Sequence, residues 1–138
     1  MPKLFASLAL IAIVALTGCR TAPLYDASGI AFTTPPTSVK RVLTMDDYKD
    51  AIIRGGAKRH WTFEDGGPGH LIGSVGVRGK HFATVDIVFD TESFSITHKS
   101  STNLNYNPEA RVIHPNYNSW IHLLENEIQS EITQMKAS

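Results

Sequence analysis

The feature that most constrains the fold is an alternation of apolar and polar side chains, every second residue, in the middle of the chain. Four such runs cover residues 60–64, 71–77, 81–89 and 94–99. Alternation with a period of two is typical of β-strands that have one buried and one solvated face. Short turns rich in Gly, Asp and Pro separate the runs. The sequence therefore predicts an antiparallel meander of four strands.

The turn lengths also predict which residues pair across the strands. The expected pairs are Phe63 with Leu71, Val77 with His81, and Phe89 with Phe94. This register gathers the odd-numbered apolar residues of the first three strands on one face, and a slip of one residue would scatter them. It also places Trp61 near Gly73, where the indole ring would cover bare backbone.

Helices are predicted on both sides of the meander. Thr44 is suited to cap a short helix that ends at Gly55-Gly56. Pro115 begins a second pattern, in which apolar residues recur every three or four positions to about residue 135. The expected fold class is α+β: a two-layer sandwich in the order α-β-β-β-β-α, with a four-stranded antiparallel meander, a short N-terminal helix and a long C-terminal helix.

The first residues have the features of a signal peptide. A basic residue precedes an apolar stretch over residues 4–16, and Leu16-Thr17-Gly18-Cys19 follows. This tetrapeptide resembles the lipobox of bacterial lipoproteins. The resemblance implies cleavage between Gly18 and Cys19 and lipidation of the Cys19 thiol. Arg20, where retained lipoproteins often have aspartate, implies the periplasmic face of the outer membrane rather than the inner membrane.

The chain is expected to divide into three parts. Residues 1–18 form the signal peptide, residues 19–43 form the lipidated N-terminus and a flexible tether rich in Thr and Pro, and residues 44–138 form a single globular domain. Thirteen Lys and Arg balance thirteen Asp and Glu, which argues against a nucleic-acid partner. Cys19 is the only cysteine, so no disulfide within the chain is expected.

The most distinctive motifs lie between residues 100 and 121. They are Ser100-x-x-Asn103-Leu104, Tyr106 and Ile113-His114-x-x-Tyr117-Asn118-x-Trp120-Ile121. They resemble a group of small uncharacterised proteobacterial lipoproteins, over about residues 44–135. The sequence departs from that pattern at Arg59-His60-Trp61. The resemblance implies a fold and a membrane location, but no activity.

Amide and aromatic side chains in this region suit recognition of a glycan, a peptide or an envelope protein. The candidate binding residues are Asn103, Tyr106, His114, Tyr117, Asn118 and Trp120. A purely structural role is the other interpretation, because asparagines favour turns and tyrosine or tryptophan can fill a core with a polar tip outward. Ile72, Phe82 and Val88 on the polar sheet face offer a second interface.

Catalysis and metal binding find little support in the sequence. The six histidines, His60, His70, His81, His98, His114 and His122, lack the spacing of a ligand set, so no metal or cofactor is expected. We therefore expect a non-enzymatic protein held on a membrane by its lipid anchor, with the oligomeric state left open. The alternative is a small hydrolase or metal-dependent enzyme that uses His98, His114 and Ser100, with Asp86 completing a triad.

Overall fold

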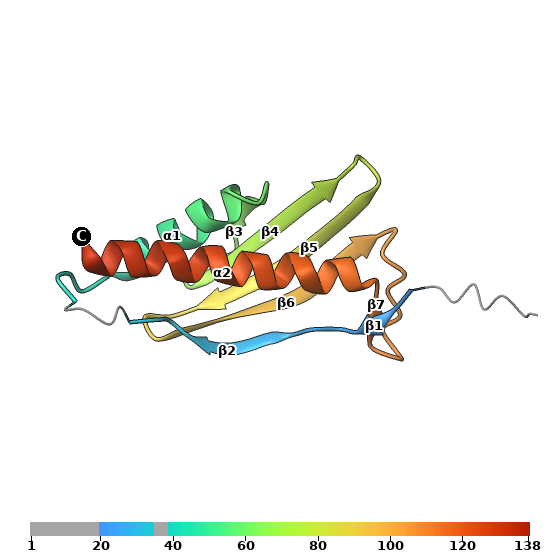
Figure 1. Ribbon diagram of the computed structural model, residues 1–138, viewed down its shortest axis with the longest axis horizontal. Coiled ribbons are helices and arrows are strands. Elements are labelled where there is room, and N and C mark those ends of the chain that lie inside the picture. The colour runs from blue at the N-terminus through green and yellow to red at the C-terminus, as the bar shows by residue number, and fades with distance from the viewer. Residues whose placement is uncertain (1–19, 35–38) are drawn as a thin grey trace, which may run out of the picture.

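A computed structural model describes residues 20–34 and 39–138 (Figure 1). The predicted signal peptide, its cleavage site and Cys19 lie outside the described residues. The elements are β1 (Ala22–Pro23), β2 (Ala27–Ala31), α1 (Met45–Ala57), β3 (Thr62–Asp65), β4 (His70–Val77), β5 (His81–Phe89), β6 (Ser93–Thr102), β7 (Val112–Ile113) and α2 (Pro115–Ala137). No helix in these two ranges is long and apolar enough to cross a membrane.

The α+β class is confirmed, although the sheet is larger than the predicted meander. The four predicted strands are β3 to β6, joined in order, and β2 adds a fifth strand beside β6. All neighbours in this sheet are antiparallel. β1 and β7 form a separate two-stranded pair at one end. Both helices cover the same face of the sheet, so the other face is solvated (Figure 1).

The prediction of a flexible tether over residues 19–43 is wrong for most of the residues in this range that the structure describes, 20–34 and 39–43. In β2, Ala27 pairs with Ile96 and Ile30 with Phe94 on the edge of the sheet. Ala27 is fully buried and Phe32 nearly so. The globular domain thus begins near residue 22 rather than at residue 44. The strand lacks an alternating pattern because its ladder is interrupted by a bulge near Gly29, which has a φ of 58°.

Two of the three expected strand pairings are confirmed, and the third is shifted. Val77 pairs with His81 and Phe89 with Phe94, whereas Phe63 pairs with Gly73 instead of Leu71. A shift of two residues keeps every side chain on its original face, so the buried face is unchanged. The ring that covers Gly73 is consequently Phe63, with a carbon 3.0 Å from where a Cβ would lie, and not Trp61.

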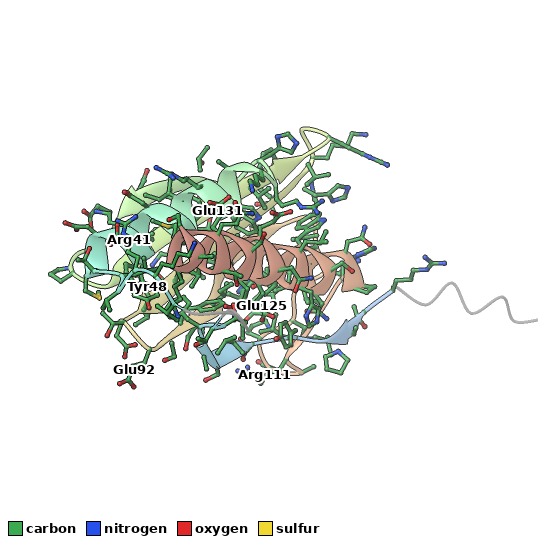
Figure 2. The ribbon with its side chains drawn as sticks, turned by 60° about the vertical axis from the view of Figure 1, so that its left-hand side comes forward. Arg41, Tyr48, Glu92, Arg111, Glu125 and Glu131 are labelled. Atoms are coloured by element: carbon green, nitrogen blue, oxygen red, sulfur yellow. The ribbon has the colours of Figure 1, made fainter. Side chains whose placement is uncertain are left out.

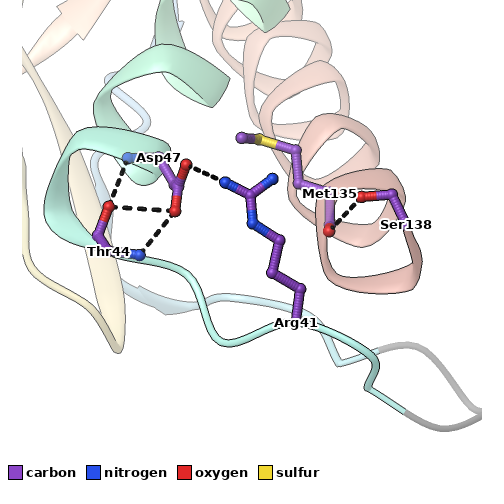
Figure 3. A network of polar contacts seen from close by, with 5 residues as sticks. All are labelled: Arg41, Thr44, Asp47, Met135 and Ser138. Atoms are coloured by element: carbon purple, nitrogen blue, oxygen red, sulfur yellow. Dashed lines mark hydrogen bonds and ion pairs between the residues drawn. The ribbon is translucent and has the colours of Figure 1, made fainter.

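The start of α1 is fixed by the cap expected from the sequence (Figure 3). The Thr44 hydroxyl accepts a hydrogen bond from the Asp47 amide, and the Asp47 carboxylate accepts one from the Thr44 amide at 2.9 Å. Arg41 forms an ion pair with the same carboxylate at 2.6 Å. Hydrogen bonding from the Thr44 backbone, helped by Arg41, lowers the pKa of Asp47. The segment before α1 is thereby tied to the helix.

The end of α1 differs from the prediction, because the helix continues through Gly55-Gly56 to Ala57. Here the glycines are required for close packing. A Cβ on Gly55 would lie 2.9 Å from the backbone carbon of Glu127 in α2, so the two helices touch backbone to backbone. Glu131 lies on the side of α2 that faces α1 (Figure 2). Its carboxylate forms an ion pair with Lys58, with Nζ and Oε1 2.6 Å apart.

We predict that Gly55→Ala destabilises the protein. In an ordinary helix the alanine would add up to about 1 kcal/mol of stability. Here the methyl group meets backbone that cannot rotate away, and overpacking of this kind costs about 1–3 kcal/mol. The free energy of unfolding in urea measures the effect. Asp50→Ala, at an exposed position of α1, is the matched control and should change that free energy by less than about 0.5 kcal/mol.

Candidate functional site

The six candidate binding residues lie at one end of the molecule, in the loop from β6 to β7 and the first turns of α2 (Figure 1). Asn103 occupies a left-handed turn with a φ of 58°. Its side-chain amide donates to the Lys80 carbonyl at 2.7 Å, and the His81 ring contacts the Asn103 carbonyl oxygen at 2.9 Å. Asn103 therefore fastens its loop to the β4–β5 turn.

Asn118 binds a segment of its own chain. Its amide oxygen accepts a hydrogen bond from the Tyr25 backbone, and its amide nitrogen donates to the Pro23 carbonyl, both at 2.9 Å. These two bonds imitate the pairing that a neighbouring strand would offer. The feature that suggested an external ligand in the sequence thus holds the stretch between β1 and β2.

The same pattern continues along α2. Tyr25 stacks on the His122 ring, with centroids 4.0 Å apart, and its hydroxyl donates to Glu125 at 2.5 Å. Burial and the Glu125 hydrogen bond raise the pKa of Tyr25 to about 12. Further along, Gln129 both accepts from the Thr33 amide and donates to the Ala31 carbonyl, at 2.9 Å each. Polar side chains along one side of α2 therefore hydrogen-bond to the chain from residue 23 to residue 33.

His114 and Tyr117 also have structural positions. His114 is the N-cap of α2, where its Nδ1 accepts from the Asn116 amide at 3.1 Å. Tyr117 is fully buried, and its hydroxyl has no hydrogen-bond partner in the described part of the chain. Burial raises the pKa of this hydroxyl strongly. Tyr117 is therefore not presented to solvent, while the His114 ring is engaged in capping the helix.

A half-buried aromatic cluster surrounds His98. Its ring lies against Tyr106, with centroids 4.0 Å apart, and meets the edge of Tyr117 at 5.4 Å. Its Nε2 is 2.8 Å from the Ser101 hydroxyl. Burial lowers the pKa of His98, and the negative charge of Asp26 opposes this only in part. The neutral imidazole is therefore the form that the folded protein favours.

The residues proposed for a hydrolase are not brought together. Ser100 pairs with Thr84 while His98 pairs with Val85, because a bulge shifts the register between them. Thr84 and Val85 are neighbours on β5, so their side chains point to opposite faces of the sheet. Their partners Ser100 and His98 therefore also lie on opposite faces. Asp86 is instead 2.8 Å from His70. Within residues 20–34 and 39–138, no three His, Cys, Asp or Glu side chains gather as a metal site.

Trp120 is the candidate residue that borders a hollow. A cavity of about 200 Å³ lies between the start of β3, the end of β4 and α2. We call it the Trp120 groove; it is lined by Lys58, Arg59, His60, Trp61, Val75, Val77, Trp120 and Leu123. Leu123 keeps 38% of its surface exposed. A second hollow, of about 360 Å³ at the start of α1, is spanned by a Lys49–Asp65 ion pair at 2.9 Å.

Sequence reasoning included Trp120 but missed the other walls of the groove. Leu123 follows Trp120 by three residues and widens the apolar stripe of α2 on one side, which is a signal visible in the sequence. Trp61 directly precedes β3 and Val77 ends β4, and the pairing of these two strands brings both residues to the same place.

The chain matches no protein-family model, no curated protein and no solved structure.

We predict that Asn118→Ala loosens the N-terminal segment. The change leaves the Tyr25 amide and the Pro23 carbonyl without partners, which costs about 1–3 kcal/mol in a partly buried site. Hydrogen exchange of residues 22–31 should become faster, while exchange in β4 and β5 should change less. Ser119→Ala, an exposed neighbour in the same helix, is the control, and equal effects of both variants would contradict the assignment.

We also predict that His98 makes the protein less stable in mild acid. The unfolded chain takes up a proton at the ordinary pKa of about 6.5, whereas the folded protein resists protonation at this site. Its contribution to stability is complete above pH 6.5 and is lost as the pH falls towards the lowered value. Urea unfolding at several pH values should therefore show a smaller loss for His98→Gln than for wild type. His60→Asn, which removes an exposed histidine, should retain the wild-type slope.

Proposed function

We propose that the protein is a lipid-anchored lipoprotein on the periplasmic face of the outer membrane, with a non-catalytic role in which it binds another envelope protein. The lipobox at residues 16–19 supports the anchor, and Arg20 supports the outer membrane. The observation that carries the binding role is the Trp120 groove. We include in this proposal that the protein belongs to the group of small proteobacterial lipoproteins that its motifs resemble.

The groove has the chemistry of a pocket for one apolar side chain. Two tryptophans and two valines form its walls, and the exposed Leu123 stands at its mouth. Its volume is below the range of about 300–1,000 Å³ that is usual for small-molecule sites. Protein interfaces often depend on an aromatic or aliphatic anchor that fills a small pocket of this kind. A protein partner therefore suits the groove better than a glycan.

The charges around the groove favour the same choice. Lys58 is paired with Glu131 at 2.6 Å, and Arg59 with Glu127 at 3.2 Å. Since both cations already have carboxylate partners on α2, the rim has little uncompensated charge to attract an anionic ligand. The ligand that fits is an apolar side chain of a partner protein, with hydrogen-bonding groups of that partner around it.

The solvated sheet face is the weaker candidate interface. Phe82 and Val88 are exposed by 46% and 55%, but they lie six residues apart on β5. At about 3.4 Å per residue this separation is roughly 20 Å, so the two residues do not form one continuous patch. Ile72, which is partly buried, lies diagonally across the β4–β5 ladder from Val88. A few exposed apolar residues of this kind are common on protein surfaces.

The alternative of a small hydrolase or metal-dependent enzyme draws no support from the geometry. It requires a nucleophile beside a base, and Ser100 and His98 face opposite sides of the sheet. His114 uses its ring to cap α2. We therefore do not propose an enzymatic role.

We predict that Leu123→Glu prevents partner binding. A carboxylate at the mouth of the groove would have to lose its hydration on binding, and a penalty of about 1.4 kcal/mol already lowers affinity tenfold. The measurement is chemical crosslinking in intact membranes, followed by affinity capture and quantitative mass spectrometry. A protein counts as a specific partner if the amount captured with Leu123→Glu is at least about tenfold lower than the amount captured with wild type.

Asn126→Glu is the matched control, because it adds the same charge at an exposed position one turn further along α2. It should leave the captured proteins unchanged. Cys19→Ala tests the anchor separately and should release the protein from the membrane fraction. If Leu123→Glu and Asn126→Glu capture the same proteins in the same amounts, the groove is not the binding surface.

A further inference from the structure

We propose that one end of the domain rests on the membrane surface, with its cationic side chains against anionic phospholipid headgroups. This anchor end consists of residues 20–23, the β4–β5 turn at residues 77–81 and the β6–β7 loop at residues 103–112. The inference rests on the proposed lipidation of Cys19 and adds the orientation of the domain to it.

The first argument is the length of chain between the lipid and the fold. Cys19 precedes Ala22, the first residue of β1, by three residues. Consecutive Cα atoms are 3.8 Å apart, so these two residues are separated by about 11 Å at most. β1 is fixed by its pairing of Ala22 with Ile113, and the Leu24 amide donates to the Arg111 carbonyl at 2.8 Å. A lipid on Cys19 therefore holds the anchor end close to the bilayer.

The second argument is that the three segments form one continuous surface. Asn103 joins its loop to the β4–β5 turn through the Lys80 carbonyl at 2.7 Å. Arg111 joins the same loop to the N-terminal segment through an ion pair with Asp26. The anchor end lies at one extreme of the long axis, and the C-terminus lies towards the other (Figure 1). With α2 about 34 Å long, the two ends meet different environments.

The third argument is the distribution of charge. The anchor end contains four cationic residues, Arg20, Arg78, Lys80 and Arg111, and one acidic residue, Glu109. The rest of the chain after Cys19 contains eight Lys and Arg against twelve Asp and Glu. Within the described ranges, no carboxylate lies at ion-pair distance from Arg20, Arg78 or Lys80. Three cations thus remain for phosphate groups of an anionic bilayer.

Tyr106 adds an aromatic group to this surface. It keeps 38% of its area exposed and stacks on His98 behind it. Tyrosine is enriched where proteins meet the membrane–water interface, because its ring is apolar and its hydroxyl is polar. The Ser100–Trp120 region therefore contributes to the membrane contact through Tyr106, while Trp120 belongs to the groove.

The test measures how deep each end lies on vesicles that carry the full, lipidated protein. The lipid occupies the only native cysteine, so an introduced cysteine can be spin-labelled alone. Glu109→Cys labels the anchor end and Glu92→Cys the far end, and each removes one negative charge. The vesicles are phosphatidylcholine with or without phosphatidylglycerol, plus a nickel-chelating headgroup lipid. We expect relaxation by nickel to be several-fold stronger at position 109 than at position 92.

Charge variants test the part played by the headgroups. Arg78→Glu with Lys80→Glu should reduce the difference between the two labels in vesicles that contain phosphatidylglycerol. Lys40→Glu with Arg54→Glu, which adds the same charge at exposed positions away from the anchor end, should preserve it. Equal relaxation at positions 109 and 92 in sedimented vesicles would overturn the orientation. A difference that both double variants leave intact would overturn the contact with headgroups.

Failure of the lipid anchor itself has a separate signature. Mass spectrometry of the N-terminal peptide would then show a free Cys19 thiol, and the wild-type protein would stay in solution when the vesicles sediment. That result would remove the proposed membrane location, and the orientation with it. Acylated Cys19 together with equal relaxation at both labels would remove only the orientation.

Discussion

The whole structure depends on α2, which uses two of its sides to bind two different parts of the chain. One side is apolar and buries Ile121, Leu124, Ile128 and Ile132 completely. Each such side chain contributes about 1.5–3 kcal/mol when it leaves water, so this stripe is the main attraction between the helix and the sheet. Without it the apolar face of the sheet would be exposed to solvent, because α1 alone is too short to cover it.

The second side of α2 binds the N-terminal segment with polar groups. Asn118, Glu125, Gln129 and Thr133 follow one another at spacings of seven, four and four residues, as one face of a helix requires. Each of them makes a hydrogen bond to the chain between residues 23 and 33. At its end, Lys136 donates to the Thr33 carbonyl at 3.1 Å. The segment is therefore held by this polar side of α2 as well as by the burial of Ala27 and Phe32 in the core.

This difference explains which parts of the fold could be predicted from the sequence. The meander was predictable because its residues alternate and its turns are short, and even the shifted β3–β4 register left the buried face correct. β2 was not, because a polar stripe on a helix looks like a solvated surface until its partner is known. In the candidate site, Asn118 and Tyr117 were predicted to bind a ligand, yet Asn118 hydrogen-bonds to the N-terminal segment of the chain itself and Tyr117 is fully buried. Gly55 was interpreted as a helix end because close contact between two helices leaves the same residue type as a cap.

The fastening of the N-terminal segment also connects the two proposals. A pull on a lipid at Cys19 passes through β1 to β7, and through Asn118 into α2. The anchor end is thus mechanically part of the core. Trp120 lies five residues after Pro115, the first residue of α2, which is about 8 Å along the helix axis. If the anchor end rests on the bilayer, the Trp120 groove opens close to the membrane surface, where a protein that is itself held in the membrane can reach it.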